Sequence, residues 1–305
     1  MGNFNLDSFL SKPLNELIHK ADRTRKKFIG EKMDLCSIVN AKSGLCSEDC
    51  KFCAQSSKHN TGVPSYPLLD NERILQSAIT AKEIGAERFG IVTSGRSPTN
   101  KDLDRIACAI NDIRKKTGIP VCASLGSLEK APLKLLKDAG LSRYHHNIET
   151  SREYYKNIVS THTFEERLKT IENVKTVGLE VCSGGILGMG EEWKDRLDMA
   201  LTLKNMDVDS VPVNFLIPIK GTPFESLHGI SPYDAIRAIC MFRLLLKHQS
   251  IKIAAGRETI LKDFQALGFL SGANGMLIGG YLTVKGRSVE EDHLLIKEIK
   301  KLWNG

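Results

Sequence analysis

Residues 35–56 read LCSIVNAKSGLCSEDCKFCAQS, a short apolar run followed at once by three closely spaced cysteines. The run from Leu35 to Asn40 has the length and apolar character of a buried strand. Cys46, Cys50 and Cys53 follow it in the pattern CxxxCxxC. Soft thiolate ligands select iron–sulfur clusters, copper(I) or zinc, and three thiolates bind three irons of a four-iron cluster while the fourth iron stays open. The stretch therefore predicts a metal-binding loop directly after the first strand.

A structural zinc site is the alternative interpretation of this loop. Such a site normally needs four protein ligands, and His59 is the closest candidate for the fourth. Because no nearby cysteine or histidine clearly completes the set, the pattern favours an iron–sulfur cluster.

Downstream of the loop, short apolar runs alternate with longer stretches of helical period. This alternation is typical of repeated βα units around a parallel sheet. Eight such units over about 250 residues predict an α/β fold, a (β/α)8 TIM-type barrel that is complete or partly open, with its chemistry at the C-terminal ends of the strands. The expected strands are residues 35–40, 88–94, 121–126, 143–148, 179–185, 210–217, 252–258 and 275–281.

The chain offers no linker at which to divide these units. We therefore expect a single domain over residues 1–305. Within it, residues 1–30 form an N-terminal helical extension, residues 31–288 the barrel and residues 289–305 a closing helix.

Composition and charge limit the class of protein. The 305 residues are 41% hydrophobic and carry a net charge of +7 that is spread along the chain, which does not indicate a nucleic-acid partner. No uninterrupted apolar run of about 18 residues is present to cross a bilayer, and the start of the chain lacks the apolar core of a signal peptide. We expect a cytoplasmic protein whose 8 cysteines are thiols.

Three further cysteines fall inside expected strands. Cys36, Cys122 and Cys182 belong to the first, third and fifth strands. A single strand cysteine is commonly a packing residue, but three of them beside a thiolate loop predict a second metal site. Cys108 and Cys240 lie on the apolar stripes of helices and are interpreted as packing residues.

The cysteine loop, with its aromatic Phe52 before the last cysteine, resembles the radical S-adenosylmethionine superfamily. More specifically, the chain resembles the biotin synthase family, because matching segments follow one another in the family's order. These segments are NAKSGLCSEDCKFCAQS (40–56), GAERFG (85–90), VCASLGSL (121–128), RYHHNIETS (143–151), FEERLKTI (164–171), VCSGGILGMGE (181–191), VPVNFLIPIKGTP (211–223), AAGRE (254–258) and GFLSGANG (268–275).

The resemblance implies the conversion of dethiobiotin to biotin by insertion of sulfur between two unactivated carbons. S-adenosylmethionine bound to the 4Fe-4S cluster is cleaved to methionine and a 5′-deoxyadenosyl radical, twice per biotin, and an auxiliary iron–sulfur cluster donates the sulfur. It also implies an electron donor, flavodoxin or ferredoxin, and a homodimer. The alternatives are another radical enzyme with a related barrel, such as a hydrogenase-maturation enzyme, and a non-catalytic metal-binding protein.

The resemblance also implies roles for single residues. Cys46, Cys50 and Cys53 are expected to bind the radical-generating cluster. Two arginines are expected near the auxiliary cluster, Arg88 and Arg257, with Arg257 as its unusual non-sulfur ligand. The residues expected to approach S-adenosylmethionine are Asn147, Glu149 and Arg167, and those expected to contact the substrate are Asn147 and Asn214.

The chain departs from the family at the auxiliary site. The family has cysteines on the second, third and fifth strands, but the second-strand position here is Gly90, whereas Cys36 is an added cysteine on the first strand. Neighbouring strands lie about 4.8 Å apart, so a thiolate on strand one can reach the place that strand two leaves open. We hypothesise a rearranged site of Cys36, Cys122 and Cys182 that holds a 2Fe-2S cluster or a larger, four-iron variant.

A second departure concerns the fourth strand. The family has Asn-His-Asn, one further residue and Asp, whereas this chain has His145 in place of the first amide and Glu149 in place of the acid. Glu149 keeps a carboxylate that can accept from a ribose hydroxyl, but it is one methylene longer than Asp.

Overall fold

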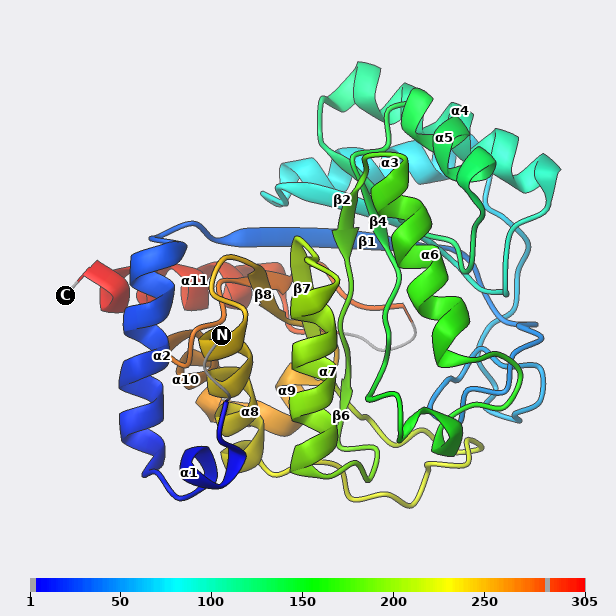
Figure 1. Ribbon diagram of the computed structural model, residues 1–305. Helices are drawn as coiled ribbons and strands as arrows, with labels where there is room; N and C mark the ends of the chain where they lie inside the picture. Colours follow the sequence, from blue (N-terminus) through cyan, green and yellow to red (C-terminus); the bar gives the residue numbers. More distant parts are fainter. Residues whose placement is uncertain (1–3, 283–285, 305) are drawn as a thin grey trace.

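The computed structural model describes residues 4–282 and 286–304, and in it the sheet closes into a parallel barrel (Figure 1). The expected (β/α)8 architecture is therefore confirmed, and the barrel is complete. Residues 1–3, 283–285 and 305 belong to the expected extension, barrel and closing helix and lie outside the described residues. The strands, in chain order, are β1 Asp34–Lys42, β2 Arg88–Thr93, β3 Val121–Ser124, β4 Arg143–His145, β5 Glu180–Cys182, β6 Gly185–Leu187, β7 Ser210–Phe215, β8 Ser250–Ile253 and β9 Gly275–Leu277.

The nine strand segments of the described residues form an eight-stranded barrel, because β5 and β6 are two parts of one interrupted strand. β5 pairs with β4 and, through Cys182 and Ser210, with β7, whereas β6 pairs with β7 and, through a bridge between Gly185 and Glu149, with the segment after β4. Gly184 lies in the interruption, where a Cβ atom would stand only 2.0 Å from the carbonyl oxygen of Pro212. The close approach of two backbones at this point therefore requires glycine.

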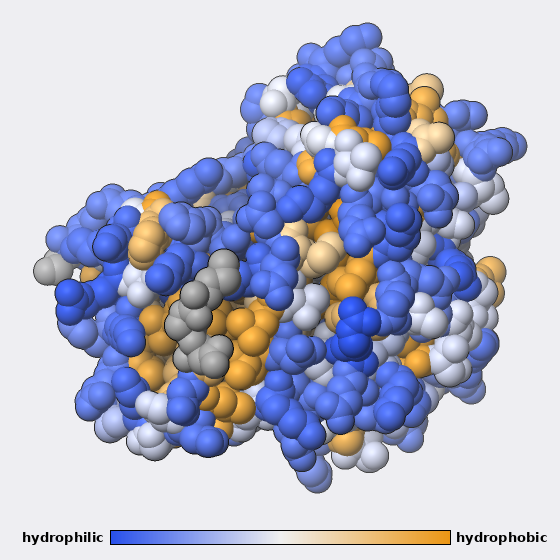
Figure 2. Space-filling model, viewed as in Figure 1, coloured by the Kyte–Doolittle hydropathy of each residue, from blue (hydrophilic) through white to orange (hydrophobic). Residues whose placement is uncertain are grey.

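Helices cover the outside of the barrel, and their apolar sides face the sheet. Figure 2 shows that the outer surface in this view is mainly hydrophilic, with apolar residues gathered between α2 and α8. No helix of the described residues has the length and apolar composition needed to span a membrane. The helices are α1 Leu6–Leu10, α2 Leu14–Phe28, α3 Asn71–Glu83, α4 Asn100–Thr117, α5 Lys130–Asp138, α6 Phe164–Thr176, α7 Trp193–Asn205, α8 Pro232–Leu245, α9 Arg257–Leu261, α10 Gln265–Leu270 and α11 Val289–Asn304, with 3-10 turns η1 Tyr155–Asn157 and η2 Lys262–Phe264.

Helices α2 and α11, far apart in the sequence, pack on the same side of the barrel, as Figure 1 shows for the blue α2 and the red α11. The Arg25 guanidinium of α2 lies 3.8 Å from the centre of the Trp303 ring of α11. Helix α2 also packs against α8 and α10. Helices α2 and α11 are thus held against each other, and α2 also against α8 and α10.

Several strands end earlier than the sequence predicts, and the difference moves one candidate residue. The seventh strand is expected over residues 252–258, but the corresponding strand, β8, ends at Ile253. Gly256 then adopts a φ of +84°, which turns the chain, and Arg257 becomes the first residue of α9 instead of a strand residue. Glycine adopts this left-handed conformation at little cost.

A buried arginine joins α8 to the chain on either side of β8. The Arg243 side chain is completely buried, and no acidic partner is found for it among the described residues. Its guanidinium instead donates hydrogen bonds of 2.7–3.1 Å to the side-chain oxygen of Asn274 and to the carbonyl oxygens of Leu246, Lys247, Gln249 and Gly272.

We expect Arg243→Met to lower the free energy of unfolding by about 4 kcal/mol, because it leaves several buried oxygens without a donor. Denaturant titration of the purified protein measures the change. Lys134→Met is the matched control, since Lys134 forms an exposed ion pair with Asp138 within α5 and its loss should cost less than about 1 kcal/mol. Equal losses for the two variants would contradict the structural role of Arg243.

Candidate active site

Two adjoining cavities occupy the inside of the barrel and its C-terminal rim. The inner cavity, of about 340 Å³, is bordered by strand residues and by residues beyond the strand ends such as Ala255 and Tyr281. The outer cavity, of about 210 Å³, is bordered by the cysteine loop. The two cavities share a wall, formed by Phe52, Val92, Ser124, His145, Asn147, Glu149 and Leu282.

The three loop cysteines are free thiols that line the outer cavity. Backbone hydrogen bonds shape the loop: the Cys53 amide donates to the Cys50 carbonyl (2.9 Å), and the Cys46 amide donates to the Gln55 carbonyl (3.0 Å). Burial, and to a lesser extent the neighbouring loop cysteines, raise the pKa of the Cys53 thiol to about 11 and that of the Cys50 thiol above its usual range. Because the three side chains repel one another as thiolates, a bound cation is needed to stabilise that form. The donor set therefore fits a metal cluster.

The loop fits a cluster better than a single zinc ion. Within residues 4–282 and 286–304, no three His, Cys, Asp or Glu side chains converge on a point where one ion could be held. In an iron–sulfur cluster each cysteine binds a different iron, so the sulfurs need not converge. His59, the candidate fourth zinc ligand, has its Nδ1 3.0 Å from the Cys53 carbonyl oxygen.

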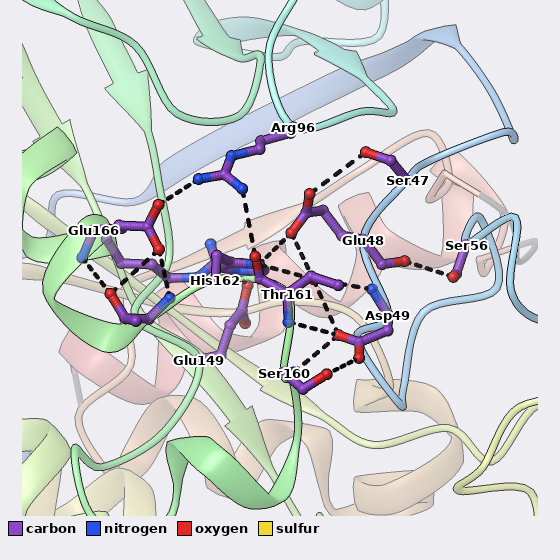
Figure 3. A network of polar contacts seen from close by, with 12 residues as sticks. Ser47, Glu48, Asp49, Ser56, Arg96, Glu149, Ser160, Thr161, His162 and Glu166 are labelled. Atoms are coloured by element: carbon purple, nitrogen blue, oxygen red, sulfur yellow. Dashed lines mark hydrogen bonds and ion pairs between the residues drawn. The ribbon is translucent and has the colours of Figure 1, made fainter.

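Side-chain hydrogen bonds fix the loop to the segment before α6. Figure 3 shows Glu48 and Asp49, which lie between the first two loop cysteines, facing Ser160, Thr161 and His162. Asp49 Oδ1 accepts from the backbone amides of Ser160 (2.9 Å) and Thr161 (3.2 Å), and Glu48 Oε2 accepts from the Thr161 hydroxyl (2.7 Å). Sequence reasoning did not find these residues, because the two segments are more than 100 positions apart.

Asn147, Glu149 and Arg167 lie together in the outer cavity, as the sequence led us to expect. Arg167 donates to the Asn147 carbonyl (3.0 Å), and its guanidinium lies 3.8 Å from a Glu149 carboxylate oxygen. Burial raises the pKa of Glu149, and Arg167 partly offsets this effect.

Glu149 also has a strained backbone. Its φ of +67° is unusual for a residue other than glycine. Opposite it, a Cβ atom at Gly185 would stand 2.3 Å from the Glu149 carbonyl oxygen. The absence of a side chain at Gly185 thus allows β6 to approach the end of β4 and hold Glu149 in this conformation.

Cys36, Cys122 and Cys182 all line the inner cavity, so the fold brings together the three strand cysteines. The register places Cys36 beside Arg88 of β2, and Gly90 beside Cys122 of β3. The space at Gly90 is not empty, because a Cβ atom there would stand 3.0 Å from the Ile38 side chain of β1.

Lys252 of β8 contacts the first of these thiols, Cys36. Its Nζ lies 2.7 Å from the Cys36 sulfur and 3.0 Å from Asp34 Oδ2. Burial raises the pKa of Cys36 to about 12 despite the opposing effect of Lys252. Burial alone would also raise the pKa of Asp34, but Lys252 and Arg143 lower it to about 2.

The environment of Cys182 is different. Burial alone would raise the pKa of its thiol, but His145, which hydrogen-bonds it, and the more distant Lys252 and Arg143 lower that pKa to about 7. This lowered pKa favours the thiolate, the form that binds metals.

Arg257 does not join this group, which corrects its expected placement beside the strand cysteines. Its side chain is 1% exposed, it donates to both oxygens of Asp292 (2.7 and 2.8 Å), and it is absent from the described lining of both cavities. The turn at Gly256 directs it toward α11 instead. The sequence analysis did not identify Lys252 as a residue of this site. Its position as the single charged residue in the apolar run SIKIAAG could have indicated a charge inside the barrel.

The remaining two candidates line the inner cavity. Arg88 pairs with Glu180 (3.1 Å). The Asn214 amide donates to the Gly185 carbonyl (3.1 Å) and accepts from the Ala255 amide (3.2 Å). Because a primary amide has two N–H groups, Asn214 keeps one donor for a ligand.

Two family models match consecutive parts of the chain. Residues 42–203 match the family model of the radical SAM superfamily, and residues 212–300 match that of the Biotin and Thiamin Synthesis associated domain. The first match runs from the end of β1 through α7, and the second from β7 into α11.

Solved structures with the same fold have low sequence identity. Methylornithine synthase has a TM-score of 0.82 at 20% identity, and the match covers 97% of this chain and 91% of that one. The FeFe-hydrogenase maturase HydG from Carboxydothermus hydrogenoformans has a TM-score of 0.83 at 18% identity, covering 97% and 75%. These likenesses establish the fold.

Curated relatives are much closer in sequence, and they share one name. The biotin synthase of Thermotoga neapolitana is 58% identical over 89% of this chain and 97% of its own. That of Thermotoga petrophila is 56% identical over 97% of this chain and 98% of its own, and that of Thermodesulfovibrio yellowstonii is 50% identical over 90% and 87%. With the radical SAM match and the geometry of the cysteine loop, these identities show that the chain belongs to the biotin synthase family.

Proposed function

We propose that the chain converts dethiobiotin to biotin, with an auxiliary iron–sulfur cluster in the inner cavity as the sulfur donor. Membership of the family makes the chain a radical SAM enzyme of sulfur insertion, which implies a 4Fe-4S cluster, S-adenosylmethionine and dethiobiotin as substrate. The observation that carries the proposal is the pair of cavities with a common wall, each bordered by its own three cysteines.

In the outer cavity, Cys46, Cys50 and Cys53 would hold the 4Fe-4S cluster. When bound, this cluster supplies the electron that cleaves S-adenosylmethionine to methionine and the 5′-deoxyadenosyl radical. Glu149, whose carboxylate lies against Arg167, would accept from the ribose hydroxyls. Asn147 lies on the shared wall, where it can contact both S-adenosylmethionine and dethiobiotin.

In the inner cavity, Cys36, Cys122 and Cys182 would hold the auxiliary cluster. Support comes from their common lining of one cavity and from the Cys182 environment that favours a thiolate. We propose Lys252, in place of Arg257, as the basic residue beside this cluster, because Lys252 contacts the Cys36 sulfur and Arg257 is held by Asp292. The cluster is a 2Fe-2S cluster or a larger four-iron variant.

The substrate would lie between the two cysteine sets. Apolar side chains such as Val92, Ile186 and Phe215 border the inner cavity and suit the aliphatic part of dethiobiotin, while they exclude water. The spare N–H of Asn214 can donate to the ureido oxygen of the substrate.

We further propose a cytoplasmic, single-domain enzyme, residues 1–305, that acts as a homodimer and receives electrons from flavodoxin or ferredoxin. The net charge of +7 supports docking of an acidic donor. Hydrogenase maturation is not supported as the function, because the maturase likeness stands at 18% identity and concerns the fold.

Anaerobic turnover tests the proposed reaction. The protein reconstituted with iron and sulfide, a low-potential reductant, S-adenosylmethionine and dethiobiotin should yield biotin, methionine and 5′-deoxyadenosine, measured by mass spectrometry. Cys50→Ser should abolish all three products, because it removes a ligand of the radical-generating cluster. Formation of 5′-deoxyadenosine without biotin would contradict dethiobiotin as the substrate.

Cys36→Ser tests the rearranged auxiliary site. We expect loss of the auxiliary iron and of biotin formation, with the 4Fe-4S cluster retained, as measured by iron and sulfide analysis and Mössbauer spectra. Cys108→Ser is the matched control, because Cys108 is exposed on α4. Full auxiliary iron and biotin formation in Cys36→Ser would show that Cys36 is an ordinary packing residue.

Lys252 and Arg257 can be separated by comparing two variants. We expect Lys252→Met to lower the auxiliary iron content at least twofold, because it removes the cation beside Cys36. Arg257→Met should lower the melting temperature, because it leaves Asp292 buried without its partner, yet keep the auxiliary iron of the folded protein. The reverse pattern of iron loss would restore Arg257 to the auxiliary site.

A further inference from the structure

A chain of four polar side chains runs from the cysteine loop to the residues proposed for S-adenosylmethionine. Glu48 of the loop contacts Nδ1 of His162, and the opposite ring nitrogen of His162, Nε2, lies 2.9 Å from the Arg167 guanidinium. Arg167 continues the chain to Glu149 at 3.8 Å. Glu48, His162, Glu149 and Arg167 all line the outer cavity, and Figure 3 shows His162 between Glu48 and the Glu149 side of the network.

The contacts of His162 define which of its ring nitrogens carries the hydrogen. Its side chain is 9% exposed, and burial together with Arg167 lowers its pKa, although Glu48 opposes this. A neutral imidazole has one donor and one acceptor. Because the Arg167 guanidinium can only donate, Nε2 must accept from it and Nδ1–H must donate to Glu48.

Arg167 depends on these contacts for its orientation. Its Nε donates to the Tyr155 hydroxyl (2.6 Å), one terminal nitrogen donates to the Asn147 carbonyl (3.0 Å), and the other is held by His162. Removing His162 leaves that last nitrogen without its partner, so the guanidinium can tilt away from the Glu149 carboxylate. It can also tilt away from Cys50, whose thiol pKa the Arg167 charge lowers.

A second anchor of the same loop does not involve Arg167. Asp49 is bound by the amides of Ser160 and Thr161 and by the Ser160 hydroxyl. Glu48 also accepts a 2.7 Å hydrogen bond from the Thr161 hydroxyl, a contact that does not involve the His162 side chain. The loop can therefore stay fixed while the link to Arg167 is cut.

We propose that His162 is a positioning residue for S-adenosylmethionine, acting by locking the Arg167 guanidinium against Glu149 and the cysteine loop. The inference rests on the proposed function, in which Arg167 and Glu149 receive S-adenosylmethionine. Nothing in it requires His162 to touch the ligand.

The test is equilibrium dialysis of radiolabelled S-adenosylmethionine against the anaerobically reconstituted protein, without reductant or dethiobiotin. We expect His162→Ala to weaken binding about tenfold, the usual effect of losing one hydrogen bond to a charged group, with iron and sulfide contents unchanged. His162→Gln, whose amide can donate to Glu48 and accept from Arg167, should return the dissociation constant to within about threefold of the wild type. Ser160→Ala, the matched control within the second anchor, should stay within about twofold.

Two results would overturn the proposal: wild-type affinity in His162→Ala, or an equal loss in Ser160→Ala, which would mean that general loosening of the loop is responsible. If His162→Ala loses iron, His162→Asn replaces it, because its shorter amide cannot span both partners, and the same tenfold difference from His162→Gln is expected. Binding is measured without turnover, so a failure of biotin formation and a failure of this inference give different results.

Discussion

Charged groups inside the closed barrel must be paired, and the inner cavity is organised by this constraint. An ion removed from water is costly unless its partner and hydrogen bonds are already in place. Asp34 of β1 meets this condition between Lys252 of β8 (3.0 Å) and Arg143 of β4 (3.4 Å), and Arg143 also pairs with Glu180 of β5 (2.8 Å). These ion pairs connect strands from opposite parts of the barrel.

The same cations set the chemistry of the strand cysteines. Lys252 lies against Cys36 and opposes the burial that raises the pKa of that thiol, and Lys252 and Arg143 add to the larger effect of His145 in lowering the pKa of Cys182. A cationic environment stabilises thiolates that would otherwise stay protonated in an apolar interior. The residues that stabilise the barrel interior thus also prepare it for an anionic, sulfur-rich group.

The two cysteine sets are held by different forces. The inner set belongs to strands whose ladder hydrogen bonds fix each position, with glycines at 184 and 185 allowing the close approach that closes the barrel and constrains Glu149. The outer set lies on an irregular loop, which has no ladder and depends on side-chain contacts from Glu48 and Asp49 to residues 160–162. Changes outside the cysteines therefore affect the outer set more readily.

The sequence by itself determined the barrel, the thiolate loop and the strand cysteines, because strand periodicity and cysteine spacing are local patterns that need no knowledge of neighbours. It also placed Asn147, Glu149 and Arg167 in one site through the family resemblance. The tertiary structure decided which charges meet. Lys252 stands beside Cys36 because β8 and β1 both pair with β9 in the closed barrel. Arg257 turns to Asp292 because a left-handed glycine at 256 redirects the chain after β8. The contact of His162 with Glu48 likewise joins residues 114 positions apart, and only the closing of the barrel brings such distant residues within hydrogen-bonding distance.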